Sequence, residues 1–275
     1  MIIDEIIKSS YTDFISFLQE ENRPSGGKKT IRTIAQNAFV GSQTRVLEIG
    51  CTNGFSSLEL HRITGCCVTG IDINPKSVDN ACIKANAYKL PREKVNFIVA
   101  SADDLPFEDE MFDLVICGNA MSFIQNKSGA IDEILRVLKP SGFLSMVPIW
   151  YNNEPDLKIV RRVSDILGFD ILCTRKIDWI NFPKVNNLEL YFCEDYGFDE
   201  QNDETIEKYI EDFFHEKKHI NVLPEETKAL IRKRWKTIIS TFNENLQIAS
   251  YSVLLMRKNP IKEEAELFTT HRLVL

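Results

Sequence analysis

A glycine turn follows one of the most apolar short segments of the chain. Residues 46–55, VLEIGCTNGF, begin as a buried strand, carry Glu48 and Gly50 at its end, and enter a helical segment after Gly54. Glycine at such a turn lets the backbone approach a ligand closely. In an open parallel sheet, ligands bind at the carboxyl ends of the strands, beside the point where the strand order reverses. We therefore expect Gly50 and Gly54 to line a binding pocket.

A carboxylate ends the next apolar segment. Asp72 lies 22 positions after Gly50, which is near the spacing at which an acidic residue accepts both hydroxyls of an adenosyl ribose. This spacing by itself fits NAD as well. The loop reads E-x-G-x-x-x-G and lacks G-x-G-x-x-G, so a pyrophosphate would miss its usual glycine cradle. The pattern favours an adenosyl ligand without phosphates.

The elements around these residues alternate between strands and helices from Arg45 to about Val147, which is the pattern of a parallel sheet with crossover helices. Asn74 and Pro75 form a cap and first position typical of a helix start. The helix before residue 140 stops at Pro-Ser-Gly. The expected strands are RVLEI (45–49), CVTGIDI (67–73), VNFIVA (95–100), FDLVIC (112–117) and FLSMVPI (143–149).

Helical periodicity also flanks this core. Residues 3–18 predict an amphipathic helix, and the turn-rich residues 22–27 after it predict a hinged lid. After the core we expect a helix over 155–167, a strand over 188–192, and a final strand over 248–256. Apolar side chains at helical spacing between the last two strands predict a helical insertion. They are Ile206, Tyr209, Ile210, Phe213, Ile231, Trp235, Ile238, Ile239 and Phe242.

Four segments, in this order, resemble the class I S-adenosylmethionine-dependent methyltransferases: LEIGCTNG, GIDINP, DLPFEDEMFDLVICGNAM and ILRVLKPSGF. Each is weak alone, and four in register are strong. The resemblance covers about residues 30–150 closely and the final strand loosely. It implies a doubly wound, mostly parallel seven-stranded α/β sheet with the last strand antiparallel. The expected parts are an N-terminal helical lid (1–30), the core (31–198), a helical cap insertion (199–246), the final core strand (247–258) and a tail (259–275).

The resemblance also implies a cofactor site for S-adenosylmethionine, with S-adenosylhomocysteine as the product. In it Glu48, Gly50 and Gly54 would surround the methionine part, and Asp72 would hold the ribose. Ile73 would pack on the adenine. Three further contacts are implied: Ala102 and Asp103 at the adenine edge, and Asn119 on the methionine side.

Two positions depart from the usual pattern of this family. Many relatives carry an acid four positions before Leu-Pro-Phe, where this chain has Ser101, so the hydrogen bond to the adenine amine is expected from Ser101 or Asp103. The middle glycine of the loop is replaced by Thr52. Gly50 and Gly54 also fit a plain strand-to-helix turn, and Asp72 also fits a cap that precedes the next helix. Asn119 also fits a turn residue that bonds its own backbone.

Methyl transfer needs alignment of the acceptor atom with the methyl group and exclusion of water, so no catalytic triad is expected. The pattern identifies no catalytic base, and it leaves open which acceptor atom is methylated, the identity of the acceptor and the oligomeric state. Candidate acceptor contacts are Trp150, Tyr151 and Glu154, which follow the fifth strand, with Tyr11 and Arg23 from the lid. Packing of Tyr11 within its helix and a solvent-exposed Arg23 fit the sequence equally well.

Other functions are weighed against this one. The formal net charge of −7 argues against binding a phosphate backbone, and residues 119–122 lack the N/D-P-P-Y tetrapeptide of many nucleobase methyltransferases. An RNA or protein methyltransferase, or a cofactor-binding module without turnover, stays open as an alternative. His215-Glu216-Lys217-Lys218-His219 matches the H-E-x-x-H zinc motif, but its helix is expected to end shortly afterwards, and we predict no metal.

Composition suggests where the chain works. The cysteines are odd in number and without C-x-x-C spacing, which is typical of reduced side chains. No apolar run approaches the length of a membrane span, and residues 1–11 do not read as a secretory signal. We expect a cytoplasmic protein whose partner is a small-molecule acceptor, with neither nucleic acid nor membrane involved.

Overall fold

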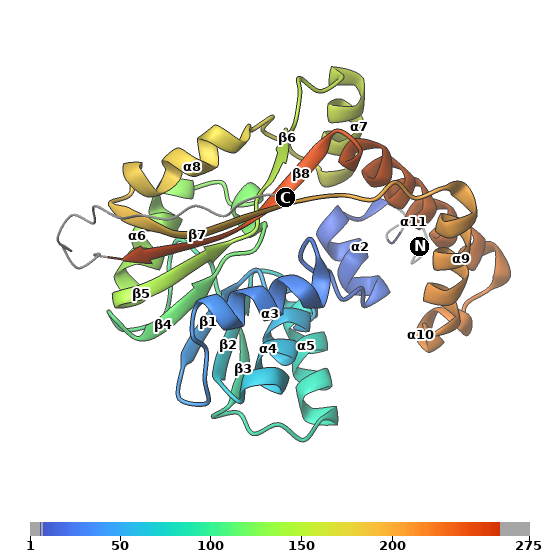
Figure 1. The fold of residues 1–275 in the computed structure, drawn as a ribbon. Coiled ribbons are helices and arrows are strands. Elements are labelled where there is room, and N and C mark those ends of the chain that lie inside the picture. The colour runs from blue at the N-terminus through green and yellow to red at the C-terminus, as the bar shows by residue number, and fades with distance from the viewer. Residues whose placement is uncertain (1–5, 7, 259–275) are drawn as a thin grey trace.

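The computed structural model describes residue 6 and residues 8–258. Its centre is one mixed sheet, with helices on both faces (Figure 1). The apolar segments predicted as strands supply most of it, because β-branched and aromatic runs favour a pleated backbone that is buried on both faces. The stretch 143–149, predicted as one strand, is divided between β5, which begins earlier at Leu138, and β6. The strands are β1 Arg45–Ile49, β2 Cys67–Asp72, β3 Val95–Val99, β4 Phe112–Ile116, β5 Leu138–Met146, β6 Ile149–Tyr151, β7 Leu188–Gly197 and β8 Ala249–Lys258.

The strand order confirms the predicted seven-stranded sheet. Strands β3, β2, β1, β4 and β5 are parallel neighbours in that order. Strand β8 runs antiparallel to β5, β6 and β7. Since β7 pairs along almost the whole of β8, β5 and β6 must share the opposite edge of β8 and together occupy one position. The eight strands therefore fill seven places, with β8 as the antiparallel strand.

Both faces of the sheet are covered by helices, as an α/β fold requires. Val46 and Leu47 are adjacent in β1 and belong to two different apolar clusters, one on each face. Asn74 caps α5 by accepting hydrogen bonds from the next turn, with Pro75 as the first residue of the helix. The helices of this part are α3 Gly27–Asn37, α4 Phe55–Thr64, α5 Pro75–Ala87, the short 3₁₀ helix η1 Ala120–Ser122, α6 Lys127–Val137, α7 Leu157–Leu167 and α8 Lys176–Val185.

Helices from the two ends of the chain share a separate apolar core. Helix α2 (Tyr11–Leu18) lies between the sheet domain and the group formed by α9 (Asp203–His215), α10 (Lys218–Asn221) and α11 (Glu225–Leu246) (Figure 1). Phe14 and Leu18 of α2 pack there with Phe214 of α9 and Trp235 of α11. The helices α9–α11 all fall within the residues expected to form the cap.

The boundaries of some elements differ from the prediction. The helix expected over 3–18 is interrupted at Ser9 and Ser10: Ile6 and Lys8 are helical, and a new helix, α2, begins at Tyr11. The Ser10 hydroxyl accepts a hydrogen bond from the Asp13 amide at 3.1 Å and caps α2; residues 1–5 and 7 lie outside the described part. Helix α8 was not expected, since Pro183 stands inside it. Strand β7 runs five residues beyond the predicted 188–192, and the predicted tail (259–275) lies wholly outside the described residues.

Candidate active site

The glycine loop leaves β1 in a conformation that requires its glycines. Gly50 and Gly54 have φ of +71° and +82°, in the left-handed region that other residues rarely adopt. A Cβ at Gly50 would lie 2.7 Å from the Cβ of Ala120, and one at Gly54 would lie 2.9 Å from both Ala81 and Phe97. The loop is therefore packed against the segment after β4 on one side and against α5 and β3 on the other.

Glu48 at the end of β1 connects the start of this loop to the helix that follows it. Its side chain is 7% exposed, and its carboxyl group accepts a hydrogen bond of 2.5 Å from the Ser57 hydroxyl in the first turn of α4. Burial raises the pKa of Glu48 to about 7, while the hydrogen bonds from serine act in the opposite direction. Glu48 thus ties the end of β1 to α4 and fixes both ends of the loop between them.

Asp72 lies across the same loop, at the end of β2. Its two carboxylate oxygens accept hydrogen bonds from the amides of Thr52 (3.0 Å) and Asn74 (2.9 Å). Burial raises the pKa of this carboxyl group, and the backbone amides oppose that rise. The neighbouring Ile73 is 73% exposed. A fixed carboxylate next to an open apolar side chain suits a ligand with hydroxyls joined to a flat apolar ring.

The residues expected after β3 and β4 also lie at this edge. Ala102 is buried, and the Ser101 hydroxyl donates to the carboxylate of Asp103, which holds the pKa of Asp103 low. The Asn119 carbonyl oxygen accepts from the Ser122 hydroxyl at 3.1 Å. Asn119 therefore serves the turn into η1 with its oxygen. Because neighbouring parallel strands end at one edge, the structure brings all ten predicted cofactor residues to that edge.

Tyr11 and Arg23 reach the same region from the N-terminal segment. The Tyr11 ring stacks on Phe123 at a centroid distance of 6.5 Å and meets Phe242 of α11 edge-on at 5.8 Å. Burial raises the pKa of the Tyr11 hydroxyl, which makes no hydrogen bond within the described residues. Arg23 pairs with Glu21 at 2.6 Å and lies over the Phe55 ring of α4 at 5.1 Å.

The three candidates after β5 have other contacts than these two. The Trp150 indole donates to the Ser252 hydroxyl at 2.9 Å, and the buried Tyr151 hydroxyl bonds the Asn245 side chain at 2.8 Å. Both side chains thus fasten β6 to β8 and α11. Glu154 is exposed in the turn before α7. The polar groups of Trp150 and Tyr151 are therefore bonded within the fold.

Comparisons with known proteins show which proteins this chain is similar to. A profile of the family described as "Methyltransferase domain" matches residues 47–146. An uncharacterized protein of Haemophilus influenzae is 34% identical over 169 residues, which cover 61% of this chain and 67% of that protein. The sterol 24-C-methyltransferase ERG6B of Gibberella zeae is 32% identical over 59% of this chain and 44% of its own length. The crystal structure of the MccD protein superposes with a TM-score of 0.72 at 24% identity, covering 86% of this chain and 99% of that one.

The chain belongs to the class I S-adenosylmethionine-dependent methyltransferases. The matched residues run from β1 to β5 and include the glycine loop, Asp72 and Asn119. This chain spans about half the length of several curated methyltransferases that it matches, such as the Gibberella enzyme. The family relation therefore concerns the cofactor half of the site most directly.

One residue of the glycine loop was not predicted as part of the site, although the structure shows that it connects three segments. Asn53 is fully buried, and its side chain joins Asn80 of α5 to the backbone of Glu20 in the N-terminal segment. The only signal for it was its place inside the glycine loop, because its partners lie 27 and 33 residues away in the chain.

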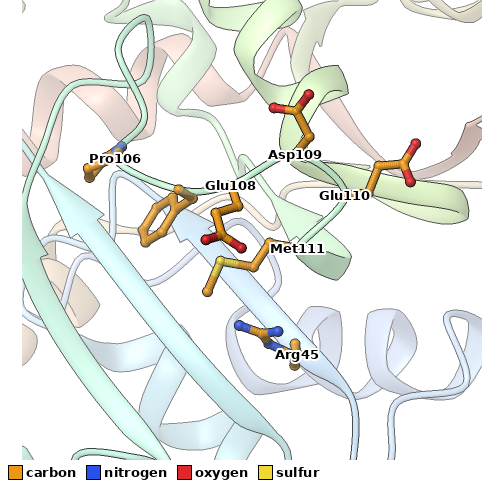
Figure 2. Close-up of a pocket in the computed structure, with 7 residues that line it drawn as sticks. Arg45, Pro106, Glu108, Asp109, Glu110 and Met111 are labelled. Atoms are coloured by element: carbon orange, nitrogen blue, oxygen red, sulfur yellow. The ribbon is translucent and has the colours of Figure 1, made fainter.

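Two other features lie outside this methyltransferase site. The H-E-x-x-H motif is split, since α9 ends at His215 and α10 begins at Lys218; the two imidazoles do not share a helix face. No group of His, Cys, Asp or Glu in the part of the chain that the structure describes is placed to hold a metal ion. A surface hollow of about 430 Å³ lies at the amino ends of β1 and β4, between Arg45 and the acidic loop Glu108–Glu110 (Figure 2), at the edge of the sheet opposite the glycine loop.

Proposed function

We propose that this chain transfers the methyl group of S-adenosylmethionine to a small-molecule acceptor by in-line displacement. The observation that carries the proposal is the fixed Asp72 carboxylate, held by the amides of Thr52 and Asn74 beside a glycine loop that lacks a pyrophosphate cradle. The exposed Ile73 next to it offers an apolar surface for adenine. When bound, the cofactor supplies a methyl group on a sulfonium, which is an excellent leaving group.

The chain's own residues then bind and orient the cofactor. In this proposal Asp72 accepts hydrogen bonds from the ribose hydroxyls, and Gly50 lets the methionine part approach the backbone. Ser101, Ala102 and Asp103 border the adenine. A fixed cofactor converts methyl transfer into a reaction between aligned partners, which supplies much of the rate enhancement.

A small acceptor is supported by the cover over the glycine loop. Helix α2 lies above α5 and is itself enclosed by the apolar cluster of α9–α11, so a large macromolecule has limited access from that side. The Gibberella relative is named for a sterol, which is consistent with a small acceptor. We propose a small-molecule partner and no nucleic acid.

All seven cysteine thiols are free, which supports a reducing, cytoplasmic location. No described helix is long and apolar enough to cross a membrane.

Tyr11 is the proposed acceptor-side hydroxyl. It lacks a hydrogen-bond partner among the described residues, and burial keeps it protonated, so it would donate a hydrogen bond to an acceptor atom rather than act as a base. Phe123 and Phe242 would form apolar walls beside it.

Isothermal titration with S-adenosylmethionine, S-adenosylhomocysteine and NADH tests the cofactor. We expect micromolar binding of the first two and none of NADH. Binding of NADH alone would overturn the interpretation of the glycine loop. Formation of S-adenosylhomocysteine with a panel of oxygen, nitrogen, carbon and sulfur acceptors then tests turnover. Turnover with RNA or protein substrates only would refute the small-molecule acceptor, and binding without any turnover would favour a cofactor-binding module.

A further inference from the structure

The segment between α2 and α3 lies directly on the glycine loop. We call residues 19–23 the strap. The Asn22 side-chain amide donates to the Thr52 hydroxyl at 3.0 Å, and the Asn53 amide donates to the Glu20 carbonyl oxygen. The two loop residues between Cys51 and Gly54 thus each hold one residue of the strap.

The bond from Asn53 belongs to a buried polar network. Its carbonyl oxygen accepts from the Asn80 amide at 2.9 Å, and the same amide donates to the Ser16 carbonyl oxygen of α2 at 3.0 Å. The Ser16 hydroxyl bonds the Ser77 hydroxyl of α5 at 2.6 Å. Buried polar groups with satisfied hydrogen bonds fix one arrangement, so this network sets where α2 and the strap lie over the loop.

Thr52 stands where the loop usually has its middle glycine, and its contacts give a structural reason for the replacement. Its φ is +45°, and that of its partner Asn22 is +49°. A β-branched residue in the left-handed region is a genuine outlier, and strain of this kind persists only where the surroundings stabilise it. The hydroxyl of Thr52, which glycine would lack, makes the bond to the strap. The side chain that strains the loop is therefore the one that holds the strap.

The strap is also held from its outer side. Lys217, between α9 and α10, donates to the Gln19 carbonyl oxygen at 2.7 Å. His219 of α10 contacts the Phe17 carbonyl oxygen at 2.9 Å. Lys217 and His219, which belong to the H-E-x-x-H sequence, thus bind the end of α2. The strap lies between the glycine loop on one side and the cap on the other.

We propose that Thr52 and Asn53 are positioning residues that latch the strap over the glycine loop, so that release of S-adenosylhomocysteine requires the latch to open. This inference rests on the proposed function, because it takes the glycine loop as the cofactor site. It predicts that the latch controls the rate at which the cofactor product leaves, in addition to any contribution to affinity.

The test compares Thr52→Val, which keeps the β-branched shape and removes the hydroxyl, with Thr52→Ser, which retains a hydroxyl. We expect S-adenosylhomocysteine to dissociate from Thr52→Val about twofold to tenfold faster, the factor that corresponds to the lost bond from Asn22. The hydroxyl also donates to the Gly50 carbonyl oxygen at 3.3 Å, and comparison with a variant of Asn22 separates that bond from the bond to the strap. Thr52→Ser should restore slow release. Stopped-flow displacement with excess S-adenosylmethionine measures the rate.

Asn22→Gly completes a double-mutant cycle with Thr52→Val. Glycine suits this position because it accepts the positive φ. If the two side chains act through their mutual bond, the double variant should release the product no faster than the faster single variant. Additive effects, or an unchanged rate in Thr52→Val, would overturn the latch.

Hydrogen exchange of the ligand-free protein tests the latch separately from cofactor binding. The amides of Gln19 and Glu20 are both bonded within α2, to the Ser16 and Ile15 carbonyl oxygens at 3.1 Å. We expect faster exchange at both amides in Thr52→Val than in the wild type and Thr52→Ser. Equal protection in all three would refute the latch. If the wild-type protein binds neither cofactor form, the proposed function fails, while the exchange experiment still decides whether the loop holds the strap.

Discussion

Replacing Glu48 by Gln should make the protein's stability respond differently to pH. In the folded state burial raises the pKa of Glu48 from 4.5 to about 7, whereas in the unfolded chain this carboxyl group titrates near its ordinary value. Between these two values the unfolded chain loses the proton first. The wild-type free energy of unfolding therefore falls as pH rises from about 4.5 to 7, through the contribution of this group.

The size of the effect follows from the same values. A rise of the pKa from 4.5 to about 7 corresponds to about 3 kcal/mol of stability lost on ionisation. Gln cannot ionise, and its carbonyl oxygen can still accept the hydrogen bond from Ser57. Relative to the wild type, Glu48→Gln should thus gain up to about 3 kcal/mol between pH 5 and pH 8. Other titrating groups are common to both proteins and cancel in the difference.

Urea unfolding at pH 5, 6, 7 and 8, followed by circular dichroism, measures that difference. Glu93→Gln removes an exposed carboxyl group from the same domain and serves as the control, for which we expect a nearly constant difference from the wild type. A difference for Glu48→Gln that stays constant from pH 5 to pH 8 would show that burial does not hold this carboxyl group neutral, and the account of Glu48 would be wrong.

Three further substitutions test other parts of the site. Asp72→Ala should weaken S-adenosylmethionine binding at least tenfold, about 1.4 kcal/mol, by isothermal titration; unchanged affinity in a folded variant would refute the ribose contact. Gly54→Ala should destabilise the fold by about 2 kcal/mol or more, against about 1 kcal/mol for Gly168→Ala, because both glycines have φ of +82° but only Gly54 has neighbours within 4 Å of an added Cβ. Equal losses in urea unfolding would exclude the close packing at Gly54. Tyr11→Phe should leave stability within about 0.5 kcal/mol of the wild type and raise KM for the acceptor; a marked loss of stability would indicate that the hydroxyl is bonded in the fold.

The sheet was predictable because its signals are local. Each of β1–β4 is a short apolar run, and the glycines and Asp72 stand at the ends of β1 and β2, so chain order alone places them at one edge. Helix α8 was not predictable in this way. It contains Pro183, and only one of its residues is buried, so it shows little of the apolar periodicity from which a helix is inferred.

Contacts between side chains that are distant in the sequence were not predictable. The contacts of Trp150 and Tyr151 come from β8 and α11, about a hundred residues further along the chain, and nothing near these residues indicates that their polar groups are already bonded. The H-E-x-x-H motif, from which no metal site was predicted, shows the same limit of local patterns. Its five letters do not reveal that α9 ends at His215.

Thr52, the residue that departs from the usual glycine loop, indicates a contact that the loop pattern itself does not predict. In sequence, Thr52 only weakens the resemblance of the loop to its family, and Asn22 is one polar residue in a turn-rich stretch. The structure brings them within hydrogen-bond distance, each with a positive φ. Local rules are broken in folded proteins mainly where another interaction compensates, and such places are often functional. Asparagine tolerates a positive φ, whereas a β-branched residue such as Thr52 rarely adopts one, so the bond from Asn22 is the interaction that compensates for the strain at Thr52.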